Sequence, residues 1–288
     1  MNDTATSTAS AYDARPCFLG EGAFWHPQRR QFFWFDIIGK RLMSRDISGA
    51  REWQFAEMAS AAGWIDANRL LIATETGLSV LDLRDTSPTP LTPLEAASPG
   101  TRSNDGRADR QGGFWIGTMG KQAEARAGAI YRWYRGELRK LVDAVTIPNA
   151  ICFSADGRLA HYADTRESRV WTQPLDAEGW PEGERRPYLD LAPRGLNPDG
   201  AVIDASGAFC VACWGDGAVR RFDPQGHELD RIAVGGLHAS CLAIGGSDMQ
   251  DLLVTTARQG MTDPDPAQGL PYLTRAPAPG LPEPKVIL

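Results

Sequence analysis

The sequence predicts an all-β protein, a six-bladed β-propeller with four-stranded blades. Three observations support this prediction. The 30 Gly and 20 Pro residues make up about 17% of the 288-residue chain, above a background of roughly 12%, and their even spread indicates many turns. Helical periodicity is nearly absent. A short motif recurs six times at an interval that suits one propeller blade.

The six repeats share one layout. Each opens at the start of a strand, continues with small or apolar residues, and leads through a turn to a second strand. The opening residues are Glu21, Ala61, Asn104, Asn149, Asp199 and Ser240. They are separated by 40, 43, 45, 50 and 41 residues, and a four-stranded blade takes roughly 40 to 50 residues. A β-sandwich, the simpler alternative, would not need six copies in one register.

The second strand of each repeat is rich in aromatic or β-branched residues, which favour strands. These strands are expected at residues 32–36, 70–74, 113–118, 159–164, 208–214 and 252–256. Later turn signals suit the hairpin between a third and a fourth strand. They lie at residues 46–49, 176–179 and 223–226.

The chain is expected to form one domain. Residues 1–15 suit a flexible leader, and residues 16–288 form the propeller. Either residues 284–288 or the segment just after the leader would supply the strand that closes the ring.

Composition excludes several classes of partner. The 30 basic and 36 acidic residues give a net charge of −6, which disfavours binding to nucleic acid or anionic lipid. No stretch approaches the roughly 18 apolar residues of a membrane span, and the first residues lack the pattern of a signal peptide. We therefore expect a cytoplasmic protein, a monomer or small homo-oligomer, that binds neither nucleic acid nor membrane.

The five cysteines form an odd, scattered set, unlike a disulfide framework. Cys210 and Cys213 spell C-x-x-C, but the segment around them is typical of a strand, in which positions three apart point to opposite faces. We expect both thiols to pack in the core rather than bind zinc or act in redox chemistry.

The opening residues of the repeats should converge, because the first strand of each propeller blade lines the central channel. This brings together two carboxylates and two carboxamides, from Glu21, Asp199, Asn104 and Asn149. Oxygen donors suit Ca²⁺, Mg²⁺ or Mn²⁺, and Zn²⁺ and Fe²⁺ also accept carboxylates. Each residue alone could belong to an ordinary turn or surface, but together they predict one divalent metal cation. His26, His161, His227 and His238 are expected to lie outside this set.

Several strings around these positions resemble the senescence marker protein/gluconolactonase family. They are Leu19-Gly20-Glu21-Gly22, Arg102-Ser103-Asn104-Asp105-Gly106, Gly117-Thr118-Met119, Pro148-Asn149 and Pro198-Asp199-Gly200. The similarity runs from about residue 17 to residue 260 in matching order. The resemblance implies a six-bladed propeller that hydrolyses sugar lactones such as glucono-, arabinono- or xylonolactone.

The resemblance also implies roles for individual residues. Glu21, Asn149 and Asp199 would bind the metal, and Asp199 would also be the general base. Arg102 and Asn104 would contact the sugar, and Lys121 and Gln122 lie where the family varies its substrate contact. Two alternatives remain at this point: a metal-binding or regulatory propeller without catalysis, and a promiscuous esterase or phosphotriesterase on the same scaffold.

Overall fold

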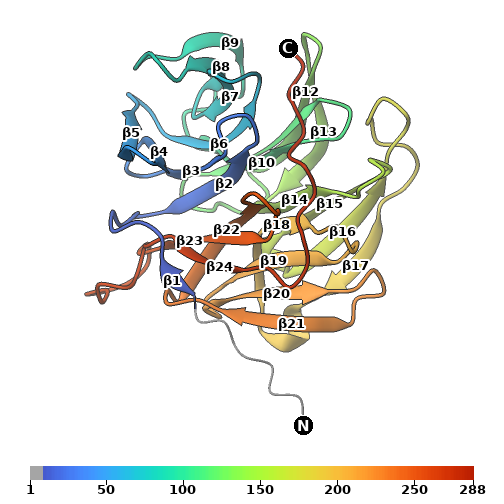
Figure 1. The fold of residues 1–288 in the computed structure, drawn as a ribbon. Helices are drawn as coiled ribbons and strands as arrows, with labels where there is room; N and C mark the ends of the chain where they lie inside the picture. Colours follow the sequence, from blue (N-terminus) through green and yellow to red (C-terminus); the bar gives the residue numbers. More distant parts are fainter. Residues whose placement is uncertain (1–8) are drawn as a thin grey trace.

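The computed structural model describes residues 9–288 and is an all-β, propeller-like arrangement of four-stranded sheets around a centre (Figure 1). Within this range the helices are two short 3-10 turns, η1 (Thr165–Glu167) and η2 (Ala192–Arg194). The all-β prediction is confirmed.

Four sheets each contain four consecutive antiparallel strands. The first contains β2 (Gly20–His26), β3 (Gln31–Asp36), β4 (Arg41–Asp46) and β5 (Gly49–Gln54). The second contains β6 (Ala59–Trp64), β7 (Arg69–Thr74), β8 (Gly77–Asp82) and β9 (Thr89–Pro93). The third contains β10 (Thr101–Ala108), β11 (Phe114–Gly120), β12 (Gly128–Tyr134) and β13 (Glu137–Val145). The fourth contains β14 (Pro148–Phe153), β15 (Leu159–Asp164), β16 (Arg169–Pro174) and β17 (Arg186–Asp190).

The rest of the strands form one eight-stranded sheet rather than two separate sheets of four. One half contains β18 (Asn197–Ile203), β19 (Phe209–Trp214), β20 (Ala218–Phe222) and β21 (Glu228–Ala233). The other contains β22 (His238–Gly245), β23 (Asp251–Ala257), β24 (Tyr272–Arg275) and β1 (Ser10–Ala11). A single residue pair, Trp214 with His238, joins the halves. The expected six separate sheets are therefore observed as four separate sheets and this joined pair.

The first strand of each repeat lies at the centre. The strands β2, β6, β10, β14, β18 and β22 each contact the next, and β22 contacts β2, so the ring is closed. The apolar core fills the space between neighbouring sheets. For example, Phe24 and Phe33 of the first sheet pack in one cluster with Ile72 of the second. The inner strands are buried almost throughout, but β10 consists mainly of polar residues.

Every inner strand changes register against its second strand near the opening residue of the repeat. Glu21 and Asn149 are the last paired residues before the shift, whereas Asn104 and Asp199 lie within it. The repeats predicted that these four opening residues are equivalent. In the structure, Asn104 and Asp199 are instead offset by one position from Glu21 and Asn149. A β-bulge bends its strand and redirects side chains, so the offset still permits convergence.

The ring is closed by a strand from an unexpected place. Ser10 and Ala11 pair with Leu273 and Tyr272, so β1 forms the outer edge beside β24. These two residues fall in the segment expected to be a leader, while residues 1–8 of that segment lie outside the described residues. Such a short strand has no sequence pattern of its own, which is why neither predicted closing segment was correct.

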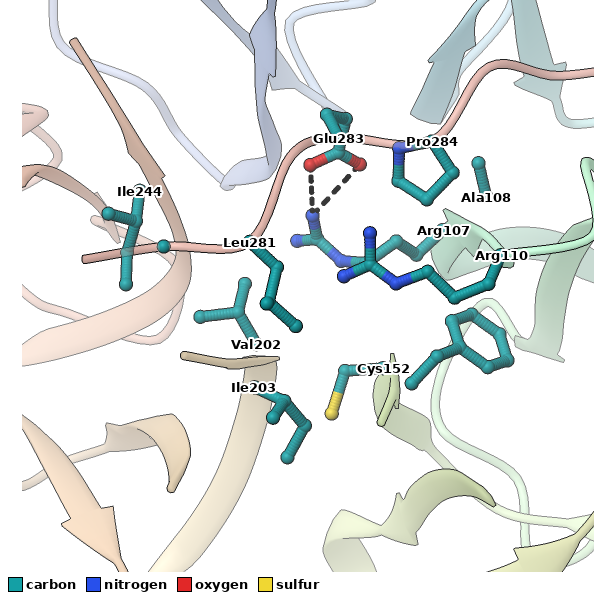
Figure 2. Close-up of a pocket in the computed structure, with 12 residues that line it drawn as sticks. Arg107, Ala108, Arg110, Cys152, Val202, Ile203, Ile244, Leu281, Glu283 and Pro284 are labelled. Carbon is teal, nitrogen blue, oxygen red and sulfur yellow. Dashed lines mark hydrogen bonds and ion pairs between the residues drawn. The ribbon is translucent and has the colours of Figure 1, made fainter. Parts of the chain in front are cut away.

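The C-terminal segment, residues 276–288, crosses the ring instead of joining a sheet (Figure 1). The Val286 N–H donates to Trp64 O at 2.9 Å, and the Ile287 N–H donates to Gly112 O at 2.8 Å. Figure 2 shows Glu283 of this segment over the Arg107 guanidinium, with both carboxylate oxygens 3.3 Å from Nη1. A small cavity of about 30 Å³ lies here, at the ends of the inner strands. The segment therefore covers one end of the ring.

All five cysteines are buried free thiols, as predicted for Cys210 and Cys213 in the core. The portion of the chain from residue 9 onward contains no helix with the length and apolar character of a membrane span.

Candidate functional site

A cavity of about 530 Å³ opens at the other end of the ring. It is lined by all seven residues that the sequence analysis selected: Glu21, Arg102, Asn104, Lys121, Gln122, Asn149 and Asp199. Glu21 and Asp199 are only 4% and 5% exposed, which is rare for carboxylates unless they are paired or bind a cation. The site therefore has buried acidic groups at its bottom and a more exposed rim.

The bulges set the positions of the buried polar groups. Gly22 has a φ of +56°, and a Cβ at this position would lie 2.1 Å from Ser60 O. Only glycine fits this close approach between the first and second sheets. The Gly22 N–H donates to Glu21 Oε2 at 3.1 Å, so the bulge and the carboxylate are held together.

A chain of hydrogen bonds orients the amide side chains across three neighbouring inner strands. Arg102 Nη1 donates to Asn104 Oδ1 at 2.8 Å, and Asn104 Nδ2 donates to Asn149 Oδ1 at 2.9 Å. Asn149 Nδ2 then donates to Thr165 Oγ1 at 2.8 Å, and Thr165 donates to Pro198 O at 2.7 Å. This network determines which atom of the Asn149 amide is the oxygen. That oxygen accepts one hydrogen bond and retains a second lone pair for a ligand.

The two carboxyl groups of the site lie within hydrogen-bonding reach of each other. Burial, followed by the charge of Asp105, raises the pKa of Glu21 to about 8. Burial and the charges of Glu21 and Asp105 raise the pKa of Asp199 well above its usual range. Two carboxylates so close together cannot both ionise easily without a cation.

These residues fit a divalent metal ion by their chemistry. Asp199 Oδ1 is buried and has no hydrogen-bond partner among the described residues, and a cation would satisfy it. Between residues 9 and 288 no three His, Cys, Asp or Glu side chains gather in a metal-binding group. A site here would therefore combine the two carboxylates with the neutral oxygen of Asn149, a donor set suited to hard cations.

Arg102 supplies positive charge beside the carboxylates. Burial lowers the pKa of Arg102 to about 10, while the charges of Glu21 and Asp199 oppose this effect. The guanidinium therefore stays protonated at neutral pH and can bind hydroxyl or carbonyl oxygens of a ligand.

Comparison with known proteins identifies the family. The family described as "SMP-30/Gluconolactonase/LRE-like region" matches residues 19–258. The chain belongs to the SMP-30/gluconolactonase/LRE-like family.

Relatives in this family have related names. An L-arabinolactonase of Azospirillum brasilense is 34% identical over 85% of this chain and 83% of its own length. A 6-deoxy-6-sulfogluconolactonase of Pseudomonas putida is 30% identical over 94% of this chain and 95% of its own length. The crystal structure of a calcium-binding protein, regucalcin, from Agrobacterium tumefaciens has a TM-score of 0.95 and 36% identity, covering 98% of both chains.

Lys121 and Gln122 lie at the rim of the cavity in this family member, and both contact acidic side chains of the protein. Lys121 Nζ forms an ion pair with Glu75 Oε1, which lies between β7 and β8 of the neighbouring sheet. Gln122 follows Lys121 in the exposed connection between β11 and β12, and its N–H donates to Glu124 Oε2 at 3.0 Å. The charge of Lys121 is thus already balanced by a protein carboxylate.

Trp214 and His238 also line the cavity, and neither was predicted from the sequence to be a site residue. His238 was expected to lie outside the set of converging opening residues, and it nevertheless lines the cavity. Trp214 ends β19 and His238 begins β22, so both lie at the same end of the ring as the opening residues. The position of His238 two residues before Ser240 was the available signal, because the start of an inner strand must face the cavity.

Asp105 is the third buried carboxyl group near the site. It is 3% exposed, and its Oδ2 accepts a hydrogen bond from Ile151 N at 2.8 Å. Burial raises the pKa of Asp105 to about 6, although this hydrogen bond and the charge of Arg107 oppose the shift. Its sequence suggested only a turn, because Asn-Asp-Gly is a turn signal in itself.

Proposed function

We propose that this protein hydrolyses sugar lactones to aldonic acids and uses one divalent metal cation. The observation that carries the proposal is the pair of buried carboxyl groups, Glu21 and Asp199, in one cavity with Arg102 and the two amides. Membership of a family with relatives named as lactonases supports the same reaction class. On this proposal the enzyme is a carboxylic ester hydrolase of the gluconolactonase type.

Glu21, Asn149 and Asp199 would hold the metal, which is Ca²⁺, Mg²⁺, Mn²⁺, Zn²⁺ or Fe²⁺. When bound, a divalent cation supplies Lewis acidity toward an ester carbonyl and toward water. The hydrogen bond from Asn104 holds the Asn149 amide in one orientation, so its oxygen is available without reorganisation.

Asp199 is the proposed general base. With one carboxylate oxygen on the cation, it would use the other to accept a proton from water. As the water oxygen bonds to the lactone carbonyl carbon, the proton passes to Asp199. The ring C–O bond then breaks, and the ring oxygen leaves with that proton as a hydroxyl group.

Arg102 and Asn104 would hold the lactone, and Lys121 and Gln122 would contact substituents at the rim. Arg102 has charged N–H donors for the carbonyl or hydroxyl oxygens, and Asn104 is already fixed by its neighbours. A cavity lined by these groups suits a polyhydroxylated ester rather than an apolar one.

A panel of five- and six-carbon aldonolactones tests the proposal. Acid release, corrected for spontaneous opening, should require a divalent metal, stop after chelation and return when the metal is restored. Metal binding without turnover of any lactone would instead favour a calcium-binding protein, the role named for the regucalcin structure.

The metal site has a separate test. Asp199→Ala and Glu21→Ala should each lose most of the bound metal, because each leaves one formal anion at the site. Glu75→Gln, which removes a carboxylate at the rim, should retain it. Full metal occupancy in both Ala variants, measured by elemental analysis, would refute the ligand assignment.

The proposal includes a six-bladed propeller in a single domain. The two halves of the eight-stranded sheet count as separate blades because one residue pair alone joins them. The ring of six inner strands supports this count.

A further inference from the structure

Trp214 and His238 form a stacked aromatic pair at the cavity wall. Their ring centroids are 4.2 Å apart and their planes differ by 16°. Both residues line the cavity, and the backbone pairing of Trp214 with His238 fixes their relative position. The pair is therefore a rigid stack of two nearly parallel rings in the wall of the candidate substrate site.

The position of Trp214 is also fixed by apolar packing. It packs against a buried cluster formed by Leu19, Ile37 and Ala257. Leu19 lines the cavity as well, so this wall is contributed by the first sheet and both halves of the eight-stranded sheet. An aromatic side chain held this way loses little entropy when it binds a ligand.

Across the ring, the third sheet presents mainly polar groups to the cavity. Arg102 and Asn104 come from β10, and Lys121 directly follows β11. The cavity thus has one aromatic wall and one polar wall. A sugar ring has the matching asymmetry, because its C–H groups form an apolar face while its hydroxyl groups point outward.

The charges on the walls favour a neutral ligand. Burial lowers the pKa of His238, although a hydrogen bond with the Gln259 backbone opposes the shift, so burial favours the neutral imidazole. Lys121 is paired with Glu75, and Arg102 lies beside the Glu21 and Asp199 carboxyl groups. No cation of the described cavity lining is left without an acidic neighbour to recognise a phosphate or sulfonate.

We propose that Trp214 and His238 form a stacking platform for the C–H face of a neutral, single-ring sugar lactone, and that Trp214 determines specificity for the ring. This inference rests on the proposed lactonase function, since it names the substrate class of the same cavity. The platform positions the ring so that its oxygens meet Arg102 and Asn104.

The kinetic test compares Trp214→Leu and Trp214→Phe with the wild-type protein. Trp214→Leu should raise KM for an aldonolactone roughly three- to tenfold with little change in kcat, as expected for loss of an aromatic contact. Trp214→Phe should restore most of the affinity. Trp171→Leu is the matched control, because Trp171 is partly buried on β16 and does not line the cavity, and its KM should stay at the wild-type value.

A binding test is independent of turnover. The probe is glucono-1,5-lactam, a neutral ring in which an amide replaces the ester, and linear glucitol is its control. By isothermal titration calorimetry the wild-type protein should bind the lactam more tightly than glucitol, and Trp214→Leu should lose this preference while melting at a similar temperature.

The outcomes separate the two proposals. Binding of the lactam that depends on Trp214, without hydrolysis of any lactone, would support the platform and refute the proposed function. Hydrolysis with unchanged KM and lactam affinity in both Trp214 variants would refute the platform alone. Equal affinity of the wild-type protein for lactam and glucitol, or tighter binding of 6-phosphogluconate than of the lactam, would also overturn it.

Discussion

Arg102 occupies the boundary between the carboxylates and the space for a ligand. Its hydrogen bonds to residues 9–288 use Nη1 alone, which donates to Ser103 O and Asn104 Oδ1 at 2.8 Å. Its other nitrogens are therefore available to a ligand. The same contact means that Arg102 also holds Asn104, so binding and orientation are coupled through one side chain.

Replacing Arg102 by Ala should reduce kcat/KM about tenfold to a hundredfold, because charge-assisted hydrogen bonds to a ligand contribute roughly 1.5 to 3 kcal/mol. Lys should recover only part of the loss, since an ammonium group lacks the planar fork. The measurement is lactonase kinetics together with metal content. Loss of most of the metal along with activity would show that Arg102 acts mainly through the metal site rather than on the substrate.

Individual site residues could be predicted to different extents. Glu21, Asn104, Asn149 and Asp199 were predictable because repeat symmetry brings strand openings together, and all four line the cavity. Trp214 was not, because a bulky residue at a strand end has the same pattern in a core as in a binding wall, and the place of His238 before Ser240 was a signal that was not used. Their relative position depends on one pairing between the two halves of the eight-stranded sheet, which no local pattern encodes.

The β-bulges position the polar side chains of the site. Substitution of Gly22, in the bulge of β2, tests this dependence. A Cβ at Gly22 would lie 2.1 Å from Ser60 O, and the Gly22 N–H holds Glu21 Oε2. Gly22→Ala should lower the free energy of unfolding by more than about 2 kcal/mol and reduce metal occupancy as Glu21 moves.

Gly195→Ala is the matched control for this variant. Gly195 has a similar φ of +64°, and no atom lies within 4 Å of the position that a Cβ would take there, so only the backbone penalty of about 1 kcal/mol remains. Denaturant unfolding and elemental analysis of both variants provide the comparison. Equal losses of stability, with metal retained in both, would show that the close approach has no special role.

The C-terminal segment is held by a nearly buried ion pair. The Arg107 and Glu283 side chains are only 9% and 11% exposed. Glu283→Gln leaves the guanidinium buried without its anion, so the free energy of unfolding should fall by about 3 kcal/mol or more. The control is Glu137→Gln, which removes the exposed ion pair of Glu137 with Arg139. This variant should change the free energy of unfolding by less than about 1 kcal/mol. The shift of the denaturation midpoint measures both effects, and similar shifts would contradict the buried role.

At the level of elements, strands with a strong pattern were predictable and short or irregular ones were not. Each expected second strand overlaps an observed one, for example residues 159–164 and β15, because buried apolar runs bounded by turns are distinctive. The two-residue β1 and the crossing C-terminal segment have no such pattern. Their places are determined by the completed ring.

For the whole molecule, acid stability should depend on buried neutral histidines. Burial lowers the pKa of His161 to about 4, whereas the unfolded chain titrates near 6.5. Between these values the unfolded state binds more protons, so this group's contribution to stability is lost as the pH falls from about 6.5 to 4. The raised pKa of Glu21, at about 8, has the opposite effect, since that group favours folding as the pH falls.

The difference between wild type and His161→Asn isolates this contribution. The unfolding free energy of the wild type should fall relative to the variant by up to about 3 kcal/mol between pH 6.5 and pH 4. Urea denaturation across that range measures it. Parallel pH profiles for the two proteins would show that His161 is not the neutral, buried group described here.

The pairing of β1 with β24 also has a consequence for protein synthesis. Ser10 and Ala11 are made long before their partners Leu273 and Tyr272. The first four sheets consist of consecutive strands, so they can form one after another during translation. The ring can close only once β24 has been made, and until then β1 lacks its partner. Synthesis of β24 is therefore the step after which this outer edge can form.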